Sequence, residues 1–275
     1  MSASDKLAHE ALASAGQFGA SRATLADGRN VFIKRHAAAP AGIFAAEARG
    51  LALLRQARCL RVPQVWAVDA SGIVLQDLGT GRPDPAQWQR AGVLLARQHA
   101  QHGAHFGLER DGWCGDSRQS NTPDTNGWRF FAEQRLLPQA RRARDANLLQ
   151  SDDIAAIERL CRQLPQRIPE QPPSLLHGDL WRANLHACGD GELALIDAAA
   201  AHYGWPEADL AMLTLFGEPP QVFFEAYQQE SRCDPDWRRR APIYNLYHLL
   251  NHLNLFGTSY LSGVRAVLRI STSDM

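Results

Sequence analysis

The sequence predicts an α+β fold with two lobes, a small one built on an antiparallel sheet and a larger, mainly helical one. Two strand-turn-strand patterns fall within the first 80 residues and flank one helical segment. Beyond residue 80 the clearest apolar repeats have the 3.6-residue period of helices. We therefore expect an N-terminal lobe over residues 1–80 and a C-terminal lobe over residues 81–275.

The first lobe is predicted to have the order strand, strand, helix, strand, strand, after a short helix over residues 7–15. The stretch ATLADGRNVFIKR carries a DG pair between two strand-like runs, and such a pair accepts the positive φ of a hairpin turn. PAGIFAAEARGLALLRQA then spaces its apolar residues for a helix. QVWAVDASGIVLQDLG adds two strands around a Ser-Gly turn.

The second lobe follows the Gly- and Pro-rich connector GTGRPDPAQW. Helices are predicted in AQWQRAGVLLARQHAQH, WRFFAEQRLLPQARRARD, DDIAAIERLCRQL and IYNLYHLLNHLNLFG, the last ending at Gly257. SRQSNTPDTNG has no periodicity and is interpreted as a functional or mobile loop. LHACGDGELALID is predicted to be a hairpin that turns at residues 189–191.

Composition excludes several classes of protein. The 29 basic and 29 acidic residues cancel, so no net field favours nucleic acid or an anionic membrane as a partner. The N-terminus lacks the apolar centre of a signal peptide, and no apolar run approaches the roughly 18 residues that span a bilayer, so we expect a cytoplasmic protein. The five cysteines form no CxxC pair, which favours reduced, mostly buried thiols. The oligomeric state stays open, with a monomer favoured.

Three oxygen-bearing residues are spaced as a phosphate-bound metal site requires. Asp179 lies in LLHGDLWRANL, Asn184 follows in the same stretch, and Asp197 ends the predicted hairpin, which would fold it back beside Asn184. Carboxylate and amide oxygens are ligands that Mg²⁺ prefers. Phosphoryl transfer also needs a carboxylate that orients the acceptor hydroxyl and takes its proton, the role we assign to Asp179. Each residue alone would more simply cap a turn, so the combination carries the prediction.

The first lobe supplies the complementary positive charge. Lys34 ends the strand VFIK, and Glu47 lies on the helix that follows. A lysine at a strand end, held by a carboxylate, can reach the α and β phosphates of ATP. Without the downstream residues, VFIK would be read as an amphipathic strand with a solvated lysine.

Two further segments are candidates for nucleotide contacts. Gly16 and Gly19, in SAGQFGAS, allow backbone N–H groups to approach phosphate, although the stretch lacks a full GxGxxG. The backbone from Gln76 to Leu78 precedes the connector and is expected to bind the adenine edge.

On these residues the sequence resembles the kinase-like phosphotransferases and, more closely, the fructosamine kinase (ketosamine-3-kinase) family. The HGD loop, Asn184 and Asp197 match the wider group, whereas HFGLERDGW, FFAEQRLLPQ, HYGWPEADLAMLTLFG, FFEAYQ and YHLLNHLNLFG match this family over residues 105–260. The resemblance implies a protein-kinase-like fold and ATP-dependent phosphorylation of the 3-hydroxyl of a ketosamine, free or on glycated protein. It also implies a role in deglycation.

The resemblance also implies an acceptor pocket. Trp181 matches a family tryptophan whose indole face would stack on the sugar; the alternative is a buried indole that packs the loop. His248 and His252 are spaced i, i+4 on the last long helix, and without the glutamate of HExxH we interpret them as a polar face toward the acceptor. Arg182 occupies a position where relatives have small residues. Its side chain is expected either to contact a substrate anion or to point to solvent, and we favour the solvent-exposed orientation.

Neighbouring polar residues receive structural interpretations. The same resemblance implies that the carboxylate of Asp209 braces the catalytic loop by binding the backbone N–H groups of that loop. Ala198 replaces the proline that usually follows the metal-binding aspartate in this family, which puts the pocket shape in question. Three histidines are expected to be partly exposed rather than metal ligands: His99, His102 and His105.

Two other functions stay open. A kinase of another small hydroxylated amine, such as an aminoglycoside or choline, would have an acidic acceptor pocket without a stacking tryptophan. A non-catalytic nucleotide-binding module would lack the lysine, the base or a metal ligand, all of which are present here.

Overall fold

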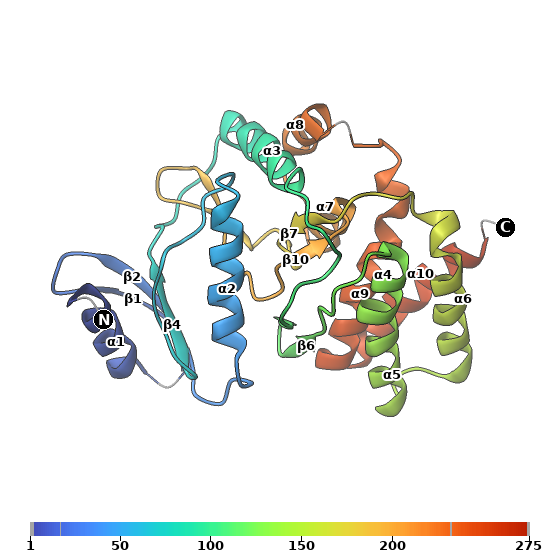
Figure 1. Cartoon of the computed structure of the whole chain (residues 1–275), viewed down its shortest axis with the longest axis horizontal. Helices are drawn as coiled ribbons and strands as arrows, with labels where there is room; N and C mark the ends of the chain where they lie inside the picture. Colours follow the sequence, from blue (N-terminus) through green and yellow to red (C-terminus); the bar gives the residue numbers. More distant parts are fainter. Residues whose placement is uncertain (1–2, 17, 232, 274–275) are drawn as a thin grey trace.

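The computed structural model describes residues 3–16, 18–231 and 233–273, and it has the two-lobed, kinase-like architecture that the sequence predicts (Figure 1). The N-terminal lobe is a four-stranded antiparallel sheet in the order β1-β2-β4-β3. Its elements are α1 (Ala3–Ser14), β1 (Phe18–Thr24), β2 (Asn30–His36), α2 (Ile43–Gln56), β3 (Val65–Val68) and β4 (Gly72–Gln76). The predicted element order is confirmed, and the first helix is longer than expected.

Alternation along β2 decides which of its side chains reach the site. Val31 and Ile33 are buried in a cluster with α1, whereas Phe32 packs against the larger core that includes α2. Because successive side chains of a strand point to opposite faces, Lys34 shares the face of Phe32. Burial of each large apolar side chain in these layers contributes about 1.5–3 kcal/mol. The lysine is therefore directed toward α2 by the packing of its neighbours.

The C-terminal lobe is mainly helical. Its helical segments are α3 (Pro85–His99), α4 (Gly127–Phe131), a π-helical turn (Ala132–Leu136), α5 (Leu137–Asp145), α6 (Ser151–Arg167), α7 (Pro206–Leu215), α8 (Gln221–Ser231), α9 (Trp237–Phe256), a 3₁₀ turn (Thr258–Tyr260) and α10 (Leu261–Ser273). Short antiparallel pairs join β5 (Gly112–Cys114) to β6 (Ser117–Gln119), β7 (Ser174–Leu176) to β10 (His202–Gly204), and β8 (Leu185–Ala187) to β9 (Leu193–Leu195).

Two predictions for this lobe need correction. The helix expected over residues 128–145 is interrupted by the π-helical turn, and the loop expected over residues 117–127 begins with strand β6. A three-residue strand is too short for alternation to be detected in the sequence. The predicted end of the last long helix at Gly257 is confirmed, with a φ of 86° at that glycine.

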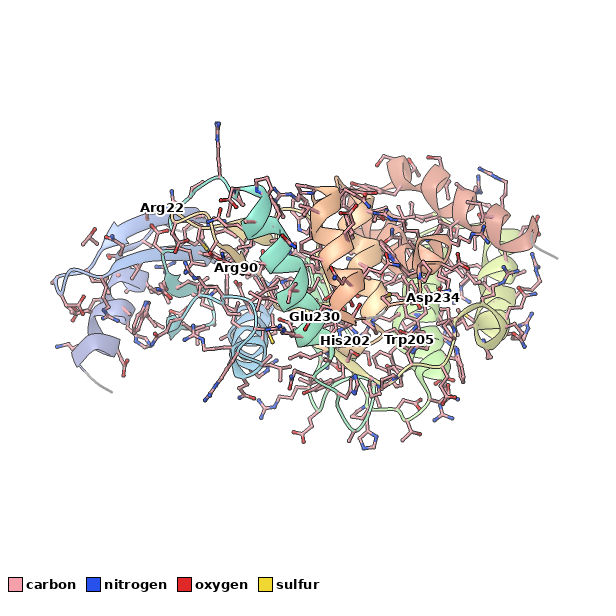
Figure 2. The ribbon with its side chains drawn as sticks, turned by 90° about the horizontal axis from the view of Figure 1, so that it is seen from above. Arg22, Arg90, His202, Trp205, Glu230 and Asp234 are labelled. Carbon is pink, nitrogen blue, oxygen red and sulfur yellow. The ribbon has the colours of Figure 1, made fainter. Side chains whose placement is uncertain are left out.

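Polar contacts of Arg22 and Arg90 lie on either side of the connector between the lobes (Figure 2). Arg22 on β1 donates from Nη2 to Thr80 Oγ1 at 2.9 Å and forms an ion pair with Asp77 at 3.0 Å. Arg90 on α3 forms an ion pair with Glu192 beside β9. The main hydrophobic core is also continuous from the sheet and α2 into the helical lobe. The ion pair of Arg61 with Asp190 at 2.9 Å adds charge to this packing between the lobes.

The cysteines and the membrane expectation can be compared with the structure. All five cysteines are free, but only Cys114 and Cys188 are buried, so the prediction of mostly buried thiols was wrong for the other three. Across the part of the chain that the structure describes, no helix combines the length and apolar character needed to cross a bilayer.

Candidate active site

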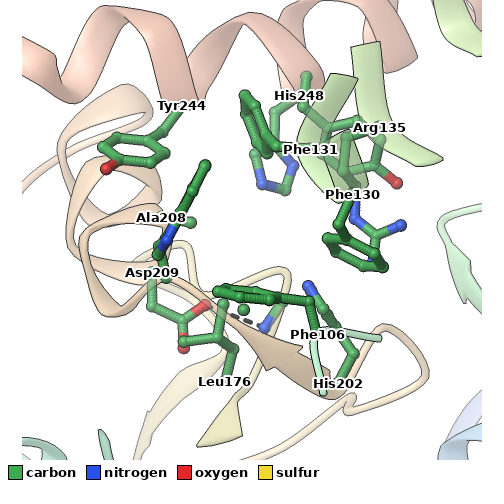
Figure 3. A pocket seen from close by; sticks show the side chains of 14 residues that line it. Phe106, Phe130, Phe131, Arg135, Leu176, His202, Ala208, Asp209, Tyr244 and His248 are labelled. Atoms are coloured by element: carbon green, nitrogen blue, oxygen red, sulfur yellow. Dashed lines mark hydrogen bonds between the residues drawn. The ribbon is translucent and has the colours of Figure 1, made fainter. Parts of the chain in front are cut away.

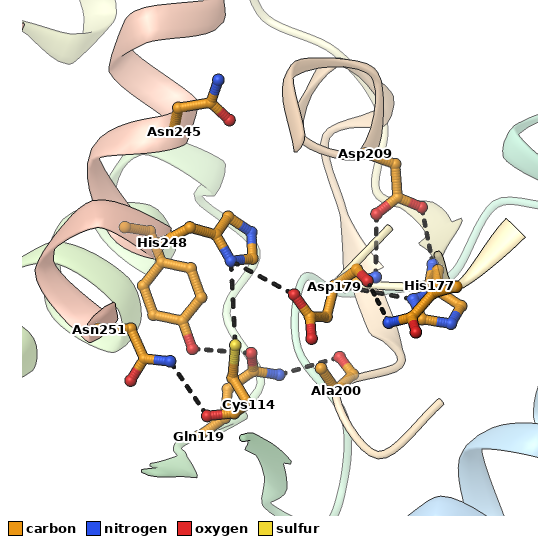
Figure 4. A network of polar contacts seen from close by, with 12 residues as sticks. Cys114, Gln119, His177, Asp179, Ala200, Asp209, Asn245, His248 and Asn251 are labelled. Carbon is orange, nitrogen blue, oxygen red and sulfur yellow. Dashed lines mark hydrogen bonds and ion pairs between the residues drawn. The ribbon is translucent and has the colours of Figure 1, made fainter. Parts of the chain in front are cut away.

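The catalytic loop follows directly from β7 and is held by a single carboxylate. Asp209 on α7 accepts hydrogen bonds from the backbone N–H of His177 at 2.7 Å and of Gly178 at 2.9 Å, which confirms its predicted bracing role (Figure 4). Gly178 has a φ of 82°, and a Cβ there would lie 2.2 Å from the carbonyl oxygen of Ala200. Only glycine fits this turn.

Asp209 also contacts a histidine, His99, whose burial was not predicted from the sequence. His99 lies 3.3 Å from Asp209 Oδ2 through Nε2 and 2.8 Å from the Tyr227 hydroxyl through Nδ1. Burial would raise the pKa of Asp209, but the hydrogen bonds from His99 and from the loop outweigh it and hold that pKa below its ordinary value. The prediction of partial exposure is wrong for His99, which is 3% exposed, and right for His102 and His105.

His177 connects the catalytic loop to the segment that carries Asp197. Its Nδ1 accepts a hydrogen bond from the backbone N–H of Asp179 at 3.3 Å, so Nε2 carries the proton and donates to the carbonyl of Ile196 at 2.7 Å. This buried imidazole therefore fixes the spacing between the loop and the residue just before Asp197.

The predicted hairpin brings Asn184 and Asp197 together. β8 pairs with β9 in the register Leu185 to Leu195, and the backbone N–H of Ile196 donates to the carbonyl of Asn184 at 3.1 Å. The Asn184 amide nitrogen donates to the carbonyl of Asp179 at 2.8 Å, which leaves the amide oxygen to accept from, or to bind, a partner. Asp197 has a φ of 63°, a conformation that non-glycine residues adopt rarely and mostly at functional sites.

Lys34 lies between two carboxylates, as the sequence predicts for Glu47. Its Nζ is 2.7 Å from Glu47 Oε1 and 3.1 Å from Asp197 Oδ1. Burial lowers the pKa of Lys34, but the two carboxylates raise it by more, so the lysine is charged. Burial raises the pKa of Glu47 to about 7, although the charge of Lys34 opposes this. The Asp197 carboxylate and the Asn184 amide oxygen are oxygen donors of the kind that Mg²⁺ prefers.

The segment after Asp197 packs directly against α2. A Cβ at Gly50 would lie 1.8 Å from the carbonyl oxygen of Ala198, so only glycine allows this approach. Ala198 is fully buried. The alanine that departs from the family pattern therefore lies in the contact between Asp197 and the helix that carries Glu47.

The salt bridge between Lys34 and Glu47 predicts a partial loss of activity when Glu47 is replaced by a neutral residue. Glu47→Gln is expected to lower kcat/KM for ATP about tenfold to a hundredfold, because a charge-assisted hydrogen bond contributes about 1.5–3 kcal/mol and Asp197 still holds the lysine. Steady-state kinetics with varied ATP measure the effect. Glu230→Gln, which removes an exposed ion pair with Arg97, is the matched control and should leave these constants unchanged.

A cavity in the cleft lies where the sequence predicts the nucleotide. Side chains from both lobes line it, among them Phe32, Lys34, Leu75, Gln76, Leu78 and Ile196. The Leu78 carbonyl also accepts a hydrogen bond from Gly189 N–H at 2.8 Å, which ties the connector to the hairpin turn. The expected placement of Gln76 and Leu78 beside a pocket agrees with this, while adenine binding stays a prediction.

The two glycines predicted to cover phosphate lie near the same end of the sheet. Gly16 falls in the connection between α1 and β1, and Gly19 pairs in β1 with Arg35, next to Lys34. Among the described residues neither glycine lines the cavity. A phosphate contact by Gly16 or Gly19 therefore stays a prediction.

Asp179, the predicted base, lies in the loop after β7, and its side chain is 22% exposed. Burial raises the pKa of its carboxyl to about 7, and repulsion from Asp197 and Asp209 adds to this. His248 on α9 is buried, and its Nδ1 lies 3.6 Å from Asp179 Oδ1 (Figure 4). Burial lowers the pKa of His248 to about 3, so its imidazole is neutral.

The predicted acceptor residues differ in their burial and in their neighbours. Trp181 is 38% exposed, so the alternative of an indole buried within the loop is wrong. His252 is half-buried, and its ring lies 5.0–5.4 Å from those of Phe216, Phe256 and Tyr260. His248 therefore faces the base, whereas His252 joins an aromatic group. Binding of substrate by these side chains stays a prediction.

Arg182 does not point to solvent as the sequence favoured. It is half-buried, with its guanidinium carbon 4.3 Å from the centre of the Trp88 ring and Nη1 donating to the carbonyl of Leu185 at 3.3 Å. A cation over an indole face is stabilised by the negative face of the ring. Arg182 thus fastens the catalytic loop to α3.

A fully buried arginine organises the wall of the acceptor side, and sequence reasoning did not find it. Arg135, in the π-helical turn, stacks on Phe130 at 4.6 Å and donates to Asn121 Oδ1 at 2.8 Å. It lines a cavity next to the catalytic loop, together with His248 and Asp209 (Figure 3). π-helical turns often occur at functional sites, but nothing in the local sequence marks one.

The fold and the site define a protein-kinase-like phosphotransferase. An ADP-bound aminoglycoside phosphotransferase shares the fold with a TM-score of 0.59 at 13% identity, covering 94% of this chain and 90% of the other. A crystal structure of a Thermobifida fusca protein, described as a "putative fructosamine-3-kinase", is more similar, with a TM-score of 0.85, 36% identity and coverage of 94% of this chain and 90% of the other.

Sequence comparison gives the family. A family model for fructosamine kinase matches residues 3–272. A probable ketoamine kinase of Synechocystis is 37% identical over 252 residues, which cover 89% of this chain and 84% of the relative. The chain belongs to the fructosamine kinase family and is a phosphotransferase.

Proposed function

We propose that this enzyme transfers the γ-phosphoryl group of ATP, with Mg²⁺, to the 3-hydroxyl of a ketosamine. One observation carries the proposal: the Asp179 carboxyl lies close enough to Asp197 for repulsion to raise its pKa, while Asp197 pairs with Lys34 at 3.1 Å, in a chain of the fructosamine kinase family. A candidate base beside charge suited to phosphate binding is the arrangement that phosphoryl transfer requires.

In the proposed mechanism, Asp179 accepts a hydrogen bond from the acceptor hydroxyl and orients its oxygen toward the γ-phosphorus. The new O–P bond forms as the bond to the β-phosphate oxygen breaks, and the hydroxyl proton passes to Asp179. A carboxyl pKa of about 7 matches this task, because a base works best when its pKa lies near the working pH. The product 3-phosphate is unstable, so its decomposition would free the amine and repair the glycated substrate.

The nucleotide side of the mechanism is mainly positioning and charge. Lys34 would contact the α and β phosphates while Glu47 keeps its ammonium in place. Asn184 and Asp197 would hold Mg²⁺, which when bound neutralises charge on the phosphates. Because the transition state of phosphoryl transfer is loose, positioning contributes more than proton transfer.

Trp181 is proposed to hold the sugar of the acceptor. Trp181→Ala is expected to raise KM for the ketosamine about tenfold, corresponding to about 1.4 kcal/mol of lost contact, with KM for ATP unchanged. Trp181→Phe retains an aromatic face and should recover most of the affinity. Equal KM values for the ketosamine in wild type and Trp181→Ala would show that the indole does not contact the acceptor.

The proposal is tested by ADP release with a panel of acceptors: fructosyl-, ribulosyl- and erythrulosyl-lysine, glycated protein, an aminoglycoside and choline. We expect turnover with one or more ketosamines and none with the last two. Asp179→Asn, run in parallel, identifies background hydrolysis. If the enzyme turned over only the aminoglycoside or choline, the proposed ketosamine substrate would be wrong and a small hydroxylated amine would take its place.

A further inference from the structure

Three different metal-binding side chains meet at the acceptor end of the site. Cys114 comes from β5, Asp179 from the catalytic loop and His248 from α9 (Figure 4). Cys114 Sγ is 3.9 Å from His248 Nδ1, which in turn is 3.6 Å from Asp179 Oδ1. All three ligand atoms lie within 4.8 Å of one another. Within the described residues, no other three His, Cys, Asp or Glu side chains gather this closely.

The distances are close to those of a tetrahedral zinc site. With bonds of about 2.3 Å to sulfur and about 2.0–2.2 Å to nitrogen and oxygen, tetrahedral angles place sulfur and nitrogen about 3.6 Å apart and nitrogen and oxygen about 3.4 Å apart. The two pairs that include His248 exceed these values by a few tenths of an ångström, and the third pair, Cys114 Sγ and an Asp179 carboxylate oxygen, lies within 4.8 Å. Small side-chain rotations would therefore close the three ligands on one ion.

The chemistry of the ligands favours zinc over magnesium. A thiolate, an imidazole and a carboxylate suit Zn²⁺, whereas Mg²⁺ requires oxygen ligands. The thiolate and carboxylate would also balance the charge of a divalent cation. This set shares no residue with Asn184 and Asp197, so the two cations would occupy different places.

The surroundings hold the three ligands in position. Asn251 donates to the Cys114 carbonyl at 3.0 Å, and the Asn184 amide donates to the Asp179 carbonyl at 2.8 Å. Both bonds are made to backbone carbonyl groups, so neither of them occupies the Cys114 sulfur or the Asp179 carboxylate. Fixation of ligands by neighbouring hydrogen bonds is a general feature of metal sites. Asp179 is also the most exposed of the three ligands, which leaves a fourth position open toward the cleft.

We propose that Cys114, Asp179 and His248 form a zinc site that inhibits the enzyme by occupying its base. With Zn²⁺ bound, Asp179 cannot accept the acceptor proton, and the ion lies where the hydroxyl would bind. Binding of the metal is independent of the proposed function, whereas inhibition rests on the role assigned to Asp179.

Cobalt absorption tests the binding without any turnover. Co²⁺ added to the purified full-length protein should give the near-ultraviolet thiolate-to-cobalt band and the visible bands of a tetrahedral site. Cys114→Val and Cys114→Ser should abolish the thiolate band, and Cys161→Ala, which removes a half-buried thiol elsewhere, should retain it. Thermal unfolding checks that each variant is folded. Absence of the band in wild type, or its persistence without Cys114, would refute the site.

Inhibition is tested with Mg-ATP and the ketosamine identified by the panel. Zn²⁺ should inhibit wild type competitively with the acceptor, with activity restored by a chelator. The concentration for half-inhibition should rise at least tenfold in Cys114→Val. Equal inhibition of both proteins would place the inhibitory ion elsewhere. The protein could show the predicted cobalt spectrum and yet turn over none of the acceptors. That result would support the zinc site and contradict the proposed function.

Discussion

Replacement of Asp197 by alanine is expected to lower kcat about a thousandfold or more with Mg-ATP. This carboxylate lies 3.1 Å from Lys34, and Asp197 has a left-handed backbone conformation. The residue before it, Ile196, donates its backbone N–H to the carbonyl of Asn184. Its loss would remove a proposed metal ligand and one of the two anions around the lysine. The loss should be at least as large as that from replacing the base, because charge neutralisation dominates phosphoryl transfer.

A matched control is available on the same hairpin. Asp190 is exposed and pairs with Arg61 at 2.9 Å, so Asp190→Ala removes the same charge without entering the cleft. It should retain wild-type kcat. Single-turnover kinetics at saturating Mg-ATP give the rates, and titration with Mg²⁺ should show a weakened metal dependence only in Asp197→Ala. Wild-type turnover by Asp197→Ala would contradict the assignment of this residue.

Replacement of Asp179 by asparagine is expected to lower kcat about a hundredfold to ten thousandfold, the usual contribution of a general base. The binding constant for ATP should stay unchanged, because the carboxylate lies on the acceptor side. Asp116→Asn, an exposed change beside β5, is the control for loss of a nearby carboxylate. An unchanged kcat in Asp179→Asn would exclude this residue as the base.

The raised pKa of Asp179 gives the same prediction a pH dependence. A carboxyl with a pKa of about 7 is protonated, and inactive as a base, below that pH. In wild type, kcat/KM for the ketosamine should therefore rise as the pH increases through about 7, and the residual activity of Asp179→Asn should lack this step. A wild-type profile that is flat between about pH 6 and pH 8 would contradict the predicted titration.

The parts of the site that the sequence predicted are those that local patterns determine. The position of Lys34 at the end of a strand, with Glu47 on the next helix, predicted their pairing, and the hairpin between Asn184 and Asp197 returned the second residue beside the first. Both results depend on neighbouring elements and on a turn. Four helical segments of the C-terminal lobe, which contain α3, α4 with α5, α6 and α9, followed from their apolar period in the same way.

The parts that were missed depend on contacts between distant segments. His99 is 110 residues from Asp209, and Cys114 is 134 residues from His248, so neither pairing leaves a local pattern. Arg182 was expected in solvent because a charged side chain is usually exposed, but the Trp88 face on α3 offsets its partial burial. Such pairs follow from how the helices pack, which a single sequence does not specify.

The position of the transferred phosphate tests the central claim most directly. Phosphorus-31 NMR correlated to the protons of the product sugar, after incubation of fructosyl-lysine with Mg-ATP and enzyme, should show coupling of the new phosphate to the proton on carbon 3. Asp179→Asn should give no such signal over the same time. A phosphate attached to any other sugar position, or to the amine, would contradict the proposed reaction.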